Sequence, residues 1–410
     1  MALIQPAQPE AHEPGGGRRG RKAVRYAVPV AVVGVTAATI GLVPALADSG
    51  DPSLPSLTAE QIITKIAASD TQTVDGTVKI STDLGLPSVL SGGSGSSLFG
   101  GAVAPPTTGS RDGSRADPQR QFTQLLLGSH TLHVAVDGQD RQKVSIIESA
   151  AEYSVIHNGS QVWAYDSASN EVYHSTAPAD AGKDRAQHPR QAPSDAFPAT
   201  PQAAAQQVLK AAQGTATITP DGTARVAGRS AYELLIRPQH ASATTVDSIR
   251  IAVDSKTGVP LKFSLQPKGK GKAAIDIGYT KVSFDKPSAS TFSFTPPKGA
   301  KVTEGRDTAR EQKSPEGMSG LGEPTFIGSG WDTVAVFKAK GALPAAPEKN
   351  AKGGAASLLG GFGKQVSGSF GSGTLFHTRL VNVLLTQDGT VYAGAVDQSA
   401  LTAAANGAAR

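Results

Sequence analysis

Cysteine is absent from the 410 residues of this chain. Without a thiol, the protein cannot form a disulfide, a thiolate metal site or a cysteine nucleophile. The same absence excludes anchoring through a lipid-modified cysteine at an export junction. The fold must therefore depend on buried apolar side chains, and the chain is long enough for two or three domains with a sizeable core.

A basic surplus is also missing from the body of the chain. The formal net charge is +5, but residues 1–47 alone contribute five basic side chains against two acidic ones, so the remainder is nearly neutral. Nucleic-acid binding depends on a clustered basic face. The composition therefore indicates no nucleic-acid partner.

The sequence motifs of catalysis are missing as well. There is no G-x-S-x-G elbow, and Gly363-Lys364 lacks the upstream glycine and the following Ser or Thr of a phosphate loop. His133, His157 and His174 fall on neighbouring predicted strands and could converge on a metal, but partly exposed strand histidines are common. We predict a non-enzymatic protein with no catalytic residue, no metal and no cofactor.

The head of the chain has the pattern of an export signal. A basic stretch precedes an apolar run of about 20 residues, and Ala45-Leu46-Ala47 then offers a small-residue cleavage site. Cleavage is one outcome and an uncut N-terminal membrane anchor is the other. Either way, residues 1–47 predict an exported, extracytoplasmic protein, secreted or associated with the cell membrane.

The most informative stretch is Ser129–Ser175, which predicts five consecutive short strands. Asp137-Gly138 and Asn158-Gly159 suit hairpin turns that need positive φ. Residues two apart share a face of a strand, so each run offers one apolar side. These sides carry Val134 and Val136, Val144 and Ile146, Tyr153 and Val155, and Trp163 and Tyr165.

Further helices and strands flank this meander. Thr58–Gln61 is a capping box that opens a short helix, and Thr200-Pro201 starts a second one. We expect turns at Asp75-Gly76 and Asp221-Gly222. The apolar pattern of 273–284 slips by one residue, which predicts a bulge or a bend near Thr280. Between the second helix and residue 273, runs of alternating apolar and polar residues predict strands that carry Leu234, Ile251 and Phe263.

These observations predict the following layout. After the export signal comes a β-rich domain with two flexible inserts, followed by a polar linker and a small domain. The small domain is expected to be only marginally stable alone and to pack against the first domain. The small domain is expected to contain the hairpin at Asp388-Gly389 and a terminal helix from about Ser399. The predicted boundaries are 1–47 for the signal, 48–303 for the large domain, 84–118 and 176–199 for the inserts, 304–325 for the linker, and 326–410 for the small domain.

The number of helices limits how the sheet is covered. Two short amphipathic helices are too few to cover the apolar face of at least ten strands. The sheet either curls onto itself or holds an apolar guest on its concave side. A closed barrel or a sandwich would hide the same surface.

The order of the motifs adds a resemblance. A capped helix is followed by N-G-x-x-V-W-x-Y (Asn158–Tyr165), T-G-V-P-L-K (Thr257–Lys262) and F-x-F-x-P-P-x-G (Phe292–Gly299). This series resembles the LolA-like superfamily, which includes lipoprotein carriers and the RseB/MucB regulators of extracytoplasmic sigma factors. The resemblance covers roughly residues 57–302, and the small domain is similar in outline to the second domain of the regulators. Gly/Ala-rich loops and the leader look actinobacterial.

The resemblance implies a mainly β, α+β fold: a curved antiparallel half-open β-barrel with plugging helices, plus a small C-terminal α+β domain. It also implies a non-enzymatic carrier that holds a lipid or lipoprotein acyl chain in the concave face. The alternative is a regulator that binds a membrane anti-sigma factor or another envelope partner through its C-terminal domain. The predicted groove residues are Val134, Val144, Ile146, Tyr153, Val155, Trp163, Tyr165, Leu234, Ile251 and Phe263.

Overall fold

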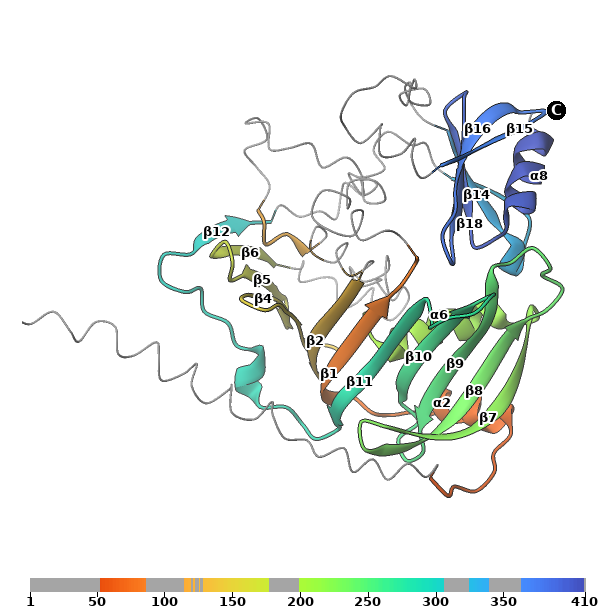
Figure 1. Cartoon of the computed structure of the whole chain (residues 1–410). Helices are drawn as coiled ribbons and strands as arrows, with labels where there is room; N and C mark the ends of the chain where they lie inside the picture. Colours follow the sequence, from red (N-terminus) through yellow and green to blue (C-terminus); the bar gives the residue numbers. More distant parts are fainter. Residues whose placement is uncertain are drawn as a thin grey trace, which may run out of the picture. The chain divides into compact units, whose positions relative to one another are not determined.

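The structure, a computed structural model shown in Figure 1, describes residues 52–85, 114–118, 121, 125, 128–176, 199–305, 324–338 and 363–408. The predicted export signal and most of both predicted inserts and of the linker lie outside these residues. Within the described ranges, no helix is long and apolar enough to cross a membrane.

A twelve-stranded sheet forms the large domain, in the order β12-β6-β5-β4-β3-β2-β1-β11-β10-β9-β8-β7. Neighbouring strands are antiparallel, apart from the parallel pair of β12 and β6. The two outermost strands, β12 and β7, do not pair with each other, so the sheet is curved but open. The strands are β1 (Thr73–Thr82), β2 (Gly128–Asp137), β3 (Arg141–Ile147), β4 (Glu152–Asn158), β5 (Gln161–Asp166), β6 (Glu171–Thr176), β7 (Ala216–Val226), β8 (Arg229–Pro238), β9 (Val246–Asp254), β10 (Pro260–Pro267), β11 (Ile275–Ser283) and β12 (Lys301–Glu304).

The five-strand meander is confirmed as β2 to β6, and its turns follow the predicted dipeptides. Gly138 and Gly159 have φ of 74° and 62°, a backbone region that favours glycine. The predicted bulge is also confirmed, because Thr77 pairs with Lys281 and Val78 with Tyr279, which leaves Thr280 as the extra residue.

Two of the predicted turns are wrong. Gly76 lies inside β1, where an added Cβ would be 2.7 Å from the Lys281 carbonyl oxygen and 2.9 Å from the Tyr279 ring. Glycine is needed there for close packing rather than for a turn. Asp221-Gly222 lies at an irregularity within β7, between Pro220 and Thr223, and the chain reverses later at Gly228.

Helices α2 (Ala59–Ala67) and α6 (Pro201–Ala212) lie on the same side of the sheet (Figure 1). In α2, Thr58 Oγ1 accepts a hydrogen bond from Gln61 N, and Gln61 Oε1 accepts one from Thr58 N, which forms the predicted capping box. In α6, Thr200 Oγ1 accepts from Ala203 N. We call the helix-bearing side the inner face; it carries Val78 and Ile80 of β1.

After β11, residues 284–304 cross the opposite, outer face of the sheet; we call this segment the strap. Its 3-10 turn η3 (Ala289–Phe292) packs on β3 and β4, and the Phe292 side chain is fully buried there. Asn158 Nδ2 donates to the Phe292 carbonyl oxygen at 3.3 Å. The strap ends as β12, which pairs with β6 at the far edge of the sheet.

The small domain is a six-stranded antiparallel sheet in the order β13-β14-β18-β17-β16-β15. Helix α8 (Gln398–Ala408) covers one face, where Leu401 and Ala405 pack with Val334, Leu384 and Tyr392. The hairpin at Asp388-Gly389 and the terminal helix match the prediction. The other elements are β13 (Thr325–Ile327), η6 (Gly330–Asp332), β14 (Val334–Lys338), β15 (Lys364–Gly368), β16 (Gly371–Phe376), β17 (Asn382–Thr386) and β18 (Thr390–Gly394).

Strand ends of the small sheet contact loops at one end of the large sheet. Thr245 N donates to the Ala395 carbonyl oxygen at 2.8 Å, and Arg379 Nη1 pairs with Asp83 Oδ2 at 2.7 Å. Leu380 is buried within the hydrophobic core of the large sheet. A few side chains of the small domain, Leu380 with Val381 and Ala395, therefore extend the core of the large sheet, while the small sheet and α8 enclose a cluster of their own.

Candidate functional site: the inner face of the large sheet

The register places most of the predicted groove residues on one face. Residues directly opposite each other in an antiparallel ladder share a face. Val78 pairs with Leu132, Gly76 with Val134, and Val78 also with Tyr279, so the inner face continues in both directions from β1. Followed pair by pair, this face includes Val134, Val144, Ile146, Tyr153, Val155, Leu234, Ile251 and Phe263. All eight belong to, or pack against, one hydrophobic cluster.

Trp163 and Tyr165 lie on the outer face, so the prediction that they share the wall with the other residues is wrong. Tyr153 and Val155 of β4 face inward, whereas Ser154 and Ile156 face outward. Trp163 pairs with Ile156 and Tyr165 with Ser154. Alternation correctly placed the two aromatics on a common side of β5 but did not indicate which side.

These two aromatics form a separate cluster beneath the strap. The Trp163 ring stacks on His174 with centroids 3.8 Å apart, and Phe294 of the strap lies 5.6 Å from Trp163 and 5.8 Å from Tyr165. His174 Nδ1 is 2.8 Å from Glu304 Oε2 at the end of β12. The motif Asn158–Tyr165 thus serves to dock the strap.

A short segment covers the inner face over β4 to β6. Tyr153 donates its hydroxyl proton to the Ala116 carbonyl oxygen at 3.1 Å, and Glu171 accepts from Arg115 N at 2.7 Å and from Ser114 Oγ at 3.1 Å. Burial raises the pKa of Tyr153, so the phenol stays neutral and keeps this bond. Residues 114–118, predicted as the end of a flexible insert, are instead packed on the sheet.

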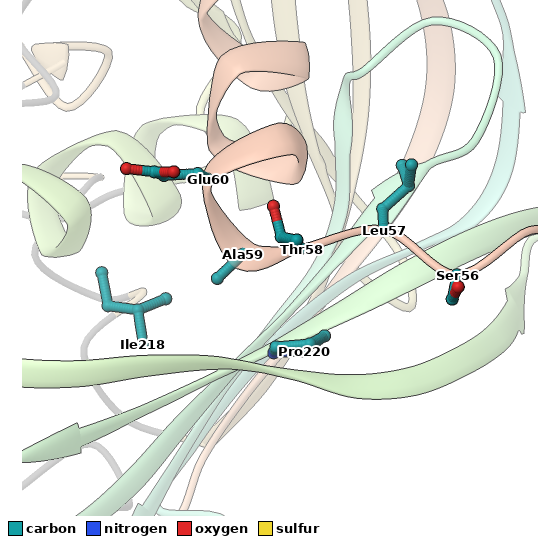
Figure 2. A pocket seen from close by; sticks show the side chains of 7 residues that line it. All are labelled: Ser56, Leu57, Thr58, Ala59, Glu60, Ile218 and Pro220. Atoms are coloured by element: carbon teal, nitrogen blue, oxygen red, sulfur yellow. The ribbon is translucent and has the colours of Figure 1, made fainter.

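An open hollow lies where the start of α2 meets β7, and Figure 2 shows its lining side chains. Its volume is about 520 Å³, and its apolar lining comes from Leu57 and Ala59 at the start of α2 and from Ile218 and Pro220 of β7. Ser56, Thr58 and Glu60 add polar atoms at its border. None of these residues was predicted from the sequence as part of the groove. The i, i+2 spacing of Ile218 and Pro220 on an edge strand was the available signal.

The ionisable groups of this region have structural roles. Burial raises the pKa of Tyr279, which is only 6% exposed, to about 12. Burial alone would raise the pKa of Asp254, but hydrogen bonds from Arg229 and Thr257 lower it below the usual range, and they hold the β9–β10 turn.

The three strand histidines do not converge. His133 and His174 are on the outer face of β2 and β6, and His157 is on the inner face of β4. His133 Nε2 lies 3.2 Å from Asp75, and His174 contacts Glu304. Among the described residues, no group of His, Asp or Glu side chains is arranged to hold a metal.

The small sheet has an apolar face of its own, on the side opposite α8; we call it the free face. Phe326 pairs with Ala335, Ala335 with Ala393, and Ala393 with Val383, so this side runs across four strands. Phe326 is 67% exposed. The remaining apolar members, all half-buried, are Phe337, Phe376, Leu385 and Val391.

Comparisons with known proteins find solved structures but no sequence family. No family model matches the chain, and no curated protein matches it. The complex of MucA and MucB from Pseudomonas aeruginosa is 16% identical, with 85% of this chain and 96% of that chain covered and a TM-score of 0.38. An uncharacterized conserved protein from Thermus thermophilus is 12% identical, with 60% and 98% covered and a TM-score of 0.30.

A LolA superfamily protein from Nitrosomonas europaea is also 12% identical, with 58% of this chain and 99% of that chain covered and a TM-score of 0.22. The matched proteins include members of the superfamily that the sequence resembles. The described fold is mainly β: an open, curved antiparallel sheet with helices on its inner face, which matches the architecture expected from the sequence.

Proposed function

We propose that this is an exported, non-enzymatic protein that binds a lipid or acyl chain on the inner face of its large sheet. One observation supports this most: the inner face is apolar across both halves of an open sheet, and separate short elements cover it. The basic and apolar pattern of residues 1–47 supports export. The scarcity of catalytic sequence motifs supports a binding role rather than an enzymatic one.

The hollow beside α2 is the proposed access point for the chain. Its volume of about 520 Å³ lies within the range of roughly 300–1,000 Å³ typical of small-molecule sites. Each buried CH₂ group stabilises the complex by about 0.8 kcal/mol. A hydrocarbon tail between Leu57 and Ile218 would therefore bind without any charged contact.

Two measurements test this proposal. The purified protein is extracted for mass spectrometry of bound lipid, and uptake of a fluorescent fatty acid is titrated. Ile218→Asp, which places a charge in the hollow, should weaken uptake at least tenfold. Thr217→Asp, on the outward side of the same strand, should leave uptake unchanged. No bound lipid together with no uptake by the wild type would contradict the proposal.

A second candidate function is supported by the free face of the small sheet. This surface fits a regulatory role in which the C-terminal domain binds a membrane anti-sigma factor or another envelope protein. The solved MucB is in complex with MucA. For the present chain, the exposed Phe326 is the observation that favours a protein partner on this face.

Because Leu380 belongs to the core of the large sheet, deleting residues 326–410 would expose that core, so a local change tests the alternative better. A photo-crosslinking residue at Phe326 should capture one membrane protein, and the same residue at the exposed Lys298 should not. The captured protein, once purified, should bind the wild type and bind Phe326→Asp at least tenfold more weakly. Equal binding to both would exclude the free face as the contact surface.

A further inference from the structure

The loop between β10 and β11 has an unusual concentration of positive charge. Lys268, Lys270 and Lys272 alternate with two glycines, and all three side chains are exposed. We call residues 268–272 the basic tip. Within the described part of the chain, no ion pair involves these three lysines, and the same holds for the exposed Lys256, Lys281 and Lys298. What distinguishes the tip is that its three lysines lie within five consecutive residues.

The backbone of the basic tip is held in place. Gly269 and Gly271 have φ of 101° and 133°, which only glycine adopts readily. Gln266 Nε2 donates to the Gly271 carbonyl oxygen at 3.1 Å, and the Arg379 guanidinium donates to the Lys272 carbonyl oxygen. An added Cβ at Gly271 would lie 3.0 Å from the Arg379 side chain. The loop therefore presents its lysines from a fixed position.

Carboxylates near the basic tip are already engaged. Asp83 accepts from Arg379 at 2.7 Å, and Asp397 accepts from Ser399 Oγ at 2.6 Å and from Ala400 N at 3.0 Å at the start of α8. Lys268 Nζ donates to a neutral acceptor, the Ser242 carbonyl oxygen, at 3.0 Å. Lys268 also lies near enough to Asp397 to stabilise its carboxylate, so the charges of Lys270 and Lys272 are the ones left for a partner.

We propose that the basic tip docks the protein on an anionic phospholipid membrane. Several lysines on one short loop can bind a lipid membrane, because each side chain can contact a different mobile headgroup. Such binding requires no partner surface of complementary shape. A nucleic acid would need a basic face extended over many residues, whereas the body of this protein is nearly neutral. Docking goes beyond the proposed ligand site and does not depend on whether the inner face holds an acyl chain.

Co-sedimentation of the full-length protein with vesicles tests the docking. One set of vesicles is phosphatidylcholine alone, and the other contains phosphatidylglycerol as well. The tip variant carries K268Q, K270Q and K272Q. The control carries K256Q, K281Q and K298Q, which removes three exposed charges elsewhere. Residues 1–47 are the same in all proteins, so their contribution cancels in the comparison.

At about 1 kcal/mol for each lysine near the surface, the tip variant should bind the anionic vesicles roughly 100-fold more weakly than the wild type. The control should keep most of the affinity, and salt should weaken wild-type binding. Circular dichroism verifies that each variant is folded. Equal losses in the tip variant and the control, or equal wild-type binding to both vesicle types, would overturn the proposal.

Discussion

Gly258 gives the sharpest test of how α2 is held against the sheet. This residue is in the β9–β10 turn at φ 76°, and an added Cβ would lie 2.2 Å from the Lys65 carbonyl oxygen in the last turn of α2. Gly258→Ala therefore has two costs. Left-handed backbone costs an alanine about 1–2 kcal/mol, and the contact forces α2 away from the turn, at about 1–3 kcal/mol for overpacking.

A matched control separates the two costs. Gly228 has φ 77° in the β7–β8 turn, and nothing lies within 4 Å of an added Cβ there. Gly228→Ala should lower the free energy of unfolding by the backbone cost alone, about 1–2 kcal/mol. Gly258→Ala should lower it by about 2–5 kcal/mol.

Urea unfolding followed by circular dichroism measures both values. The slope of the free energy against urea should be the same in the two variants, because the surface exposed on unfolding is unchanged. If the two substitutions lower the free energy of unfolding equally, the β9–β10 turn does not hold α2, and the packing described for this helix is refuted.

Three further predictions follow from the faces and the burial of single side chains. Trp163→Ala should lower the free energy of unfolding by about 1–3 kcal/mol, since the ring is half-buried, but leave fatty-acid uptake intact, because the ring is beneath the strap. A selective loss of uptake would contradict its outer-face position. Burial raises the pKa of Tyr279 to about 12, so its contribution to stability is complete below pH 10 and is lost as the pH rises through 12. In the wild type the free energy of unfolding should therefore fall over this interval, and Tyr279→Phe should reduce that fall by up to about 2.7 kcal/mol. An unchanged pH profile would show that the phenol is not buried as described. Thr58→Ala removes the capping oxygen of α2 and should lower the free energy of unfolding, measured with urea, by about 1 kcal/mol. Thr58→Ser keeps a hydroxyl and should retain most of the wild-type stability. Equal losses of stability in the two variants would exclude the capping role.

The sequence predicted the hairpins well because their chemistry is local. Gly138, Gly159 and Gly389 mark turns through their own backbone freedom, and the slip of the apolar pattern located the bulge at Thr280. Gly76 was misread for a physical reason. A glycine needed for a turn and one needed for close packing look the same in sequence, and only the Tyr279 ring, about 200 positions away, distinguishes them.

The candidate site was predicted in part. The eight inner-face residues could be grouped because most strands have one apolar side. Strand β4, for example, carries large apolar side chains on both sides, Val155 inward and Ile156 outward, because residues 114–118 cover one side of β4 to β6 and the strap covers the other. Alternation therefore could not assign Trp163 and Tyr165 to a face. The hollow at Ile218 depends on where α2 lies, which no local pattern specifies.

The position of β1 has a consequence for how this chain folds. Strands β2 to β6 form one antiparallel series and β7 to β11 another. Among the strands that the structure describes, the two series are joined in the sheet only through β1, which pairs with β2 on one side and β11 on the other. Each series can form from neighbours in sequence, but the ladder between Val78 and Tyr279 joins residues about 200 positions apart. During synthesis, the first strand must therefore wait, with one edge unpaired, until nearly the whole large domain has emerged. An edge exposed for that long is open to pairing with another chain, so the β1–β11 ladder is where folding would be slowest and where a chaperone would have most effect.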